Sequence, residues 1–159
     1  MTLRTLRFAD LLLVALTLGL TACHVMEIPG KLRLPGPDWL TVQHTLYIAF
    51  GPPLGAGIEV LAIALTWWLA FRVRRRRPAF GWTLAAALCV TAGLAIWFLL
   101  VAPMNAVLNG WTPDALPADW TAVRNRWEAG HALHAAFFLL GFGALAIAVL
   151  AETPNDAPP

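Results

Sequence analysis

The chain has 159 residues, of which 59% are hydrophobic and 13% are charged. A soluble domain carries about 25% charged residues, so this chain cannot cover itself with polar surface and much of its exterior must face an apolar medium. The formal net charge of +2 says little, and without a nucleic-acid-binding motif we expect no nucleic-acid partner. We expect an integral membrane protein in contact with the lipid bilayer.

Four stretches are long and apolar enough to cross a bilayer as helices, which takes about 20 mainly apolar residues. Their alanine and leucine content favours helices, and they lack the two-residue alternation of a barrel strand. They lie at about residues 8–27, 54–71, 80–102 and 129–150. We therefore predict an all-α fold, a single four-transmembrane-helix bundle over residues 1–150, followed by a disordered tail at 151–159.

Between the first two spans, the sequence predicts a short outer-face helix over residues 39–47. Gly51, Pro52 and Pro53 then separate it from the second span, because two successive prolines remove two backbone donors and kink the chain. This geometry would fold Gln43, His44 and Tyr47 over the mouth of the bundle.

Arginines indicate the orientation. Arg4 and Arg7 precede the first span, and five arginines within residues 72–77 follow the second. Positive residues prefer the cytoplasmic side, so we predict a multi-pass protein of the bacterial inner (plasma) membrane with both termini cytoplasmic. The alternative for the arginine run is binding to anionic lipid or nucleic acid.

Cys23 allows a competing interpretation. Residues 20–23 have the form of a lipoprotein cleavage site after a charged start and an apolar run. Cleavage would leave a lipidated Cys23 and three spans. We prefer four spans, because cleavage would leave His24 and Glu27 at a flexible end outside the bundle.

Ionisable residues within spans are few, and such residues are expensive in a membrane and usually mark function. His24 and Glu27 share one helix face at the end of the first span, because residues three apart project together. A second stripe, at the start of the fourth span, consists of Arg124, Glu128, His131 and His134. Since the first and fourth helices run antiparallel, the two clusters can face one another. Glu59 in the second span and Asn105 after the third lie at the same level.

The His-x-x-Glu and Glu-x-x-His spacings suggest a metal site, because bundles with two metal ions use such motifs. The candidate ligands are His24, Glu27, Glu59, Glu128 and His131. Imidazole and carboxylate suit iron, copper or zinc, and Arg124 would orient the Glu128 carboxylate. The alternatives are a haem held by His24 and His131, a metal-free acid–base pocket, and structural ion pairs of Arg124 with Glu27 or Glu128.

Several of these motifs resemble a known family. The run from His24 to Leu32, followed by Gln43, Tyr47 and Gly51, resembles the first-helix signature of the anthrone oxygenase-like family of small four-helix bacterial membrane proteins. The segments 103–105 and 124–131 are similar to the same family. His134 departs from the arginine that the family often has three residues after its last histidine. The resemblance implies an oxygen-dependent oxidation of an aromatic or quinone-like molecule and implies no particular cofactor.

We therefore expect a membrane oxidoreductase, an oxygenase acting on a small hydrophobic or aromatic substrate. In its metal-free form, Glu27 or Glu128 would remove a proton from an acidic phenol and Arg124 would stabilise the oxyanion. Tyr47 would contact the ring from the lid, and Gln43 and Asn105 are the expected cofactor-binding amides. The alternatives are a b-type haem or metal-binding electron carrier and a non-enzymatic binding or assembly subunit. The sequence does not identify the metal or the substrate, and it is compatible with a homodimer.

Overall fold

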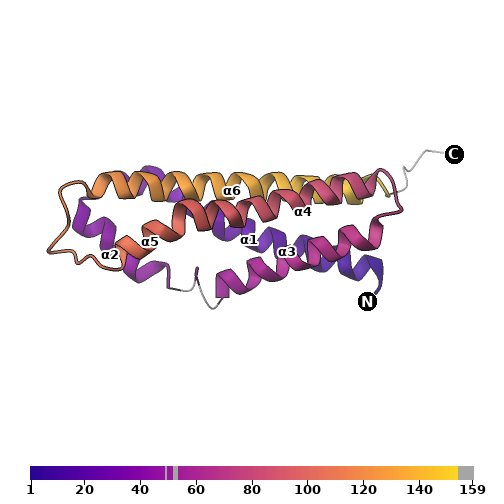
Figure 1. Ribbon diagram of the computed structural model, residues 1–159, viewed down its shortest axis with the longest axis horizontal. Coiled ribbons are helices and arrows are strands. Elements are labelled where there is room, and N and C mark those ends of the chain that lie inside the picture. The colour runs from indigo at the N-terminus through magenta and orange to yellow at the C-terminus, as the bar shows by residue number, and fades with distance from the viewer. Residues whose placement is uncertain (49, 52–53, 154–159) are drawn as a thin grey trace.

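The computed structural model describes residues 1–48, 50–51 and 54–153 (Figure 1). Within these ranges the chain forms helices and no strands, which confirms the all-α prediction. In chain order the elements are α1 (Leu3–Lys31), α2 (Gly36–Leu46), α3 (Leu54–Val73), α4 (Ala79–Ile96), the π-helix η1 (Trp97–Val101), α5 (Ala102–Leu108) and α6 (Trp120–Leu150). The kink expected at Pro52 and Pro53, and the tail from residue 154 onward, lie outside the described residues.

Four helical stretches in the described part of the chain are long and apolar enough to cross a membrane: α1, α3, the continuous α4–η1–α5 helix and α6. The four predicted spans are therefore confirmed, and the protein is a multi-pass membrane protein. The helices run beyond the predicted spans, most clearly in α6, which begins at Trp120 instead of about residue 129. Hydropathy marks only the segment that crosses the hydrocarbon, whereas a helix continues wherever its polar turns are packed against neighbours.

The helices form an up-and-down bundle in which each long helix packs against two others. α6 packs against α4 and α1, and α3 packs against α1 and α4. Figure 1 shows the N-terminus, the α3–α4 connection and the end of α6 at one end of the bundle, and α2 and α5 at the opposite end. We call these the arginine end, after the arginines of residues 72–77, and the α2 end.

At the arginine end, polar contacts tie α1 to its neighbours. Arg7 forms an ion pair with Glu152 after α6, and Arg76 of the connecting loop lies 3.6 Å from the same carboxylate. Asp10 is fully buried, and its Oδ1 accepts a hydrogen bond from the Thr66 hydroxyl of α3 at 2.7 Å. The first residues of the predicted tail, around Glu152, are therefore held against the bundle.

The outward faces of the helices are strongly apolar. Phe8, Leu88, Leu139 and Leu140 are 69%, 55%, 59% and 60% exposed. Water would penalise so much exposed apolar surface, whereas acyl chains do not. These faces are therefore the surface that contacts lipid.

Close packing of α4 on α6 depends on Gly141. A Cβ atom at this position would lie 2.8 Å from Cγ1 of Val90, and a β-branched side chain in a helix has one strongly preferred rotamer. We expect Gly141→Ala to lower the free energy of unfolding by about 1–3 kcal/mol, as overpacking does elsewhere. Graded unfolding from mild detergent into a denaturing detergent measures this change.

Gly143 provides the matched control on the same helix. A Cβ atom there meets nothing within 4 Å, so Gly143→Ala should be neutral or stabilise by about 0.5–1 kcal/mol through helix propensity. Equal stability of the two alanine variants would contradict the packing argument.

Candidate functional site

Two histidines meet in the interior near the α2 end. His24 of α1 and His131 of α6 have ring centroids 4.1 Å apart, with their planes inclined at 34°. They are only 4% and 6% exposed. The antiparallel packing of α1 and α6 brings the two sequence clusters to the same depth, as expected.

Aromatic rings surround this histidine pair. Trp127, four residues before His131 on α6, has its ring centroid 4.1 Å from that of His131 and 5.2 Å from that of His24. Among the described residues neither imidazole has a hydrogen-bond partner, and the Nδ1 atom of each is buried. Because buried polar atoms normally have partners, these two rings are available to a bound molecule.

Beside the histidines, a buried lysine joins three helices. The Nζ atom of Lys31 in α1 lies 2.9 Å from Glu128 Oε2 in α6 and 3.9 Å from Glu27 Oε2. Trp39 of α2 donates a hydrogen bond from Nε1 to the other Glu128 oxygen at 3.3 Å. The lysine is 4% exposed and its ammonium lies 4.7 Å from the centroid of the Trp127 ring. This network fixes the ends of α1 and α6 and anchors α2 across them.

Glu27 is held by two further donors. The Tyr47 hydroxyl and the Cys23 thiol both donate to its carboxylate, the thiol at 3.2 Å. The Tyr47 ring in turn lies 4.5 Å from the His24 ring, measured between centroids. The segment after α2 is thereby tied to α1 directly above the histidine pair, where the sequence predicted a lid.

Tyr47 offers a direct measurement of this contact, because it is the only tyrosine in the chain. Burial and the hydrogen bond to Glu27 raise the pKa of its phenol above the ordinary value of 10.0, since both disfavour the phenolate. We expect near-ultraviolet absorbance to show no phenolate at pH 10.0. Glu27→Gln should lower the pKa of Tyr47 toward its ordinary value, and an unchanged titration in that variant would contradict the contact.

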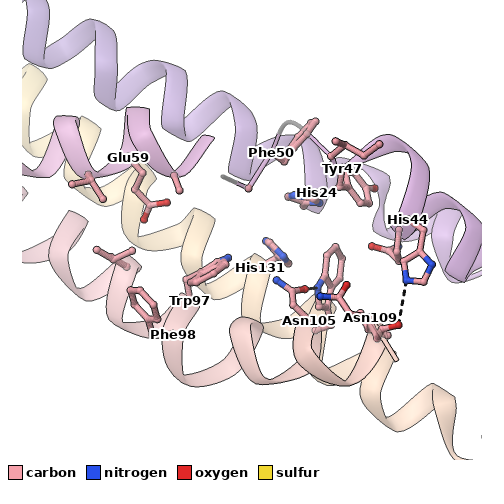
Figure 2. A pocket seen from close by; sticks show the side chains of 18 residues that line it. His24, His44, Tyr47, Phe50, Glu59, Trp97, Phe98, Asn105, Asn109 and His131 are labelled. Atoms are coloured by element: carbon pink, nitrogen blue, oxygen red, sulfur yellow. Dashed lines mark hydrogen bonds between the residues drawn. The ribbon is translucent and has the colours of Figure 1, made fainter. Parts of the chain in front are cut away.

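A cavity of about 420 Å³ adjoins the histidine pair (Figure 2). Figure 2 shows His24 and Tyr47 on one side, His131 and Asn105 on the other, Glu59 and Trp97 toward the interior, and His44 and Asn109 toward the α2 end. Most of the other lining side chains are aromatic or aliphatic. A cavity of this size with a few convergent polar groups is typical of a small-molecule site.

Two amides contribute polar groups to the cavity wall. Both amide atoms of Gln43 are buried without a partner among the described residues. The Oδ1 atom of Asn105 accepts a hydrogen bond from Trp127 Nε1 at 2.7 Å. The NH₂ group of Asn105 can then donate to another acceptor. At the rim, His44 Nε2 lies 3.2 Å from the carbonyl oxygen of Leu108. The two amides can donate to an oxygen atom of a bound ring.

A smaller hollow of about 40 Å³ lies beneath the cavity. Thr17, Thr21 and the pair formed by Glu59 and His134 contribute to its lining, together with His24 and His131. His134 Nε2 is 3.0 Å from Glu59 Oε1. The hollow has several polar lining groups and is large enough for a water molecule, so it can connect the Glu59–His134 pair to the histidines above.

The structure separates the five candidate metal ligands into different contacts. His24 touches His131, Glu59 bonds to His134, Glu27 accepts from Tyr47, and Glu128 pairs with Lys31. In the described ranges no three His, Cys, Asp or Glu side chains gather closely enough to hold a metal ion.

Among the described residues, Arg124 forms no ion pair with the carboxylates that the sequence interpretation assigned to it. Its guanidinium donates to Asn125 Oδ1 at 3.1 and 3.2 Å and lies 5.0 Å from the centroid of the Trp120 ring. Lys31 takes the place expected for Arg124 beside Glu27 and Glu128.

Sequence reasoning missed Lys31 and Trp39, and left His134 undecided. One signal was present for Lys31, which follows Glu27 by four positions and so shares its helix face. His134 follows His131 by three positions and continues the same stripe. No sequence signal pairs Trp39 with a residue 89 positions away. Comparisons with models of protein families, with curated proteins and with solved structures found no match for this chain.

Proposed function

We propose that this protein is a membrane oxygenase that oxidises a small aromatic or quinone-like molecule bound in the cavity. The observation that supports this most is the pair of buried, unpartnered imidazoles on the wall of an aromatic cavity of about 420 Å³. Aromatic walls suit a flat ring system, and the amides of Gln43 and Asn105 suit its oxygen substituents. The family resemblance of the sequence motifs points to the same chemistry.

In this proposal the base is a histidine, His131 or His24, because both line the cavity. Glu27 and Glu128 are held by Tyr47, Cys23 and Lys31 instead. The substrate carries a methylene group activated by flanking rings and a carbonyl or phenol. The imidazole accepts one C–H proton, and the amides donate hydrogen bonds to the ring oxygen on which the negative charge develops.

The remaining steps use molecular oxygen as the oxidant. The carbanion forms a C–O bond with O₂, and the imidazolium returns its proton to give a hydroperoxide. Removal of the second C–H proton then breaks the O–O bond, forms the carbonyl and releases hydroxide, which the same proton converts to water. Overall, CH₂ and O₂ become C=O and H₂O, so no other electron donor is required.

The location that goes with this activity is the bacterial inner membrane with the arginine end in the cytoplasm. The support is the run of arginines at residues 72–77, since positive residues favour the cytoplasmic side. The cavity then lies in the outer half of the membrane.

The test measures anthrone oxidation by the purified protein in lipid nanodiscs. We expect oxygen uptake and anthraquinone formation in equal amounts, faster than in nanodiscs without protein, because anthrone also oxidises spontaneously. With heavy-isotope oxygen gas, the label should appear in the new carbonyl. A rate no faster than that of empty nanodiscs, with anthrone and with phenolic substrates, would contradict the proposal.

A further inference from the structure

Some residues that line the cavity also face the lipid. Val60 of α3 and Phe98 of η1 both line it, and they are 56% and 61% exposed. On the opposite wall, His24 and His131 are only 4% and 6% exposed. The cavity is not enclosed, so the strongly exposed side chains among its lining residues mark where it comes to the surface. The cavity thus reaches the surface just after α2, beside Ile48, which lines it and is 73% exposed, and also sideways, between α3 and η1.

The depth of this opening places it beside acyl chains. Val60 lies 13 positions before the end of α3 at Val73, which is about 20 Å along a helix at about 1.5 Å per residue. Val73 adjoins the arginine end, and the hydrocarbon core is about 30 Å thick. Val60 is therefore within the hydrocarbon, in the leaflet nearer the α2 end.

The π-helix shapes the side of this opening. The Ala102 amide bonds to the Trp97 carbonyl, five residues earlier, instead of the α-helical partner four residues earlier. Pro103 has no amide hydrogen to offer in the next turn. Such wide turns are frequent at functional sites. Here Trp97 and Phe98 both reach the cavity, whereas the next residue, Leu99, is 69% exposed and does not line it.

We propose that the substrate is a neutral aromatic molecule dissolved in the bilayer, which reaches the histidines laterally between α3 and η1. This inference deepens the proposed function and rests on it for the chemistry at the ring. An opening bordered by Val60 and Phe98 within hydrocarbon admits apolar molecules and disfavours ions, because a charge loses its hydration there. The route thus selects lipid-soluble ring systems over water-soluble ones of the same size.

Photochemical labelling tests the route without any need for turnover. The protein in nanodiscs is mixed with benzophenone or with anionic 4-carboxybenzophenone and irradiated at increasing times. Mass spectrometry then counts adducts on cavity residues such as Trp97 and on the lipid-facing reference Leu99. We expect benzophenone to label the cavity several-fold faster than the carboxylate does.

Paired variants change the width of the opening in both directions. Val60→Phe should slow cavity labelling several-fold, whereas Leu61→Phe, at a 51% exposed neighbour that does not line the cavity, should leave it unchanged. Phe98→Ala should speed labelling, with Leu99→Ala as its control. The opposite directions guard against a variant that merely folds poorly.

Two results would overturn the lateral route. One is equal cavity labelling by both probes with no difference between Val60→Phe and Leu61→Phe, which would indicate access from water. The other is labelling of lipid-facing residues without any cavity adduct. If the labelling shows lateral entry but the protein does not oxidise anthrone, the lateral route stands and the oxygenase proposal is contradicted. The two proposals can therefore fail separately.

Discussion

Replacing His131 by glutamine should lower the turnover of anthrone by about 10²–10⁴-fold, the usual contribution of a general acid–base group. Glutamine approximates the size and polarity of imidazole but cannot accept a proton. The binding walls stay in place, so we expect the loss in kcat and little change in KM. Oxygen uptake and quinone formation measure both constants.

His24→Gln discriminates between the two imidazoles. Because the rings are in contact, at 4.1 Å between centroids, the double variant should be little worse than the more damaging single variant. Asn125→Ala, an exposed change on the same helix, controls for general effects on α6. Full activity in folded His131→Gln would remove His131 as the base, and full activity in both single variants would remove the histidine mechanism.

Replacing Lys31 by methionine should destabilise the protein by about 3–5 kcal/mol, as expected when one member of a buried ion pair is removed. The change leaves the Glu128 carboxylate, with a side chain only 5% exposed, without its cation. Methionine matches the aliphatic stem of lysine, so the effect reports mainly the lost charge. Graded unfolding in denaturing detergent measures the difference.

The charge argument predicts a rescue. Lys31→Met combined with Glu128→Gln removes both charges and keeps an acceptor for Trp39, so it should recover most of the lost stability. The Glu27 carboxylate is 37% exposed and keeps its hydrogen bond from Tyr47, so the loss of the Lys31 charge costs it less than it costs Glu128. Arg33→Met, an exposed change two positions along the chain, should be nearly neutral. A double variant as unstable as Lys31→Met alone would show that packing of the lysine stem, not charge, is what matters.

Local sequence patterns were enough to predict the bundle and the meeting of its two polar clusters. Apolar runs of membrane length identify helices because hydrocarbon leaves backbone groups no other partner. The three-residue spacings of His24 with Glu27 and of Glu128 with His131 place each pair on one face. Antiparallel packing of the first and last helices then brings the pairs together.

The partners within the site could not be predicted in the same way. The first predicted span ends at about residue 27, two positions before Pro29, so it leaves Lys31 outside the helix. In the structure α1 continues through Pro29 to Lys31, where burial beside Glu128 favours the helical path. Glu59 was grouped with the outer carboxylates, but it faces His134 deeper in the bundle. Such pairings depend on the rotation of each helix about its axis, which spacing within one helix does not determine.

The wide turn at Trp97–Val101 also sets the phase between the two halves of one membrane-crossing helix. One residue corresponds to about 100° of rotation in an α-helix, so an additional residue in a turn re-aims everything beyond it. In this register Asn105 meets Trp127, while Gly93, before the turn, sits against Phe138. The half of the helix before the turn thus packs in the close-packed core, and the half after the turn faces the cavity. Deleting one residue from this turn would rotate one half of the helix relative to the other, so the contacts of Gly93 and those of Asn105 could not both form. The wide turn therefore allows one helix to pack against the core and also to line the cavity.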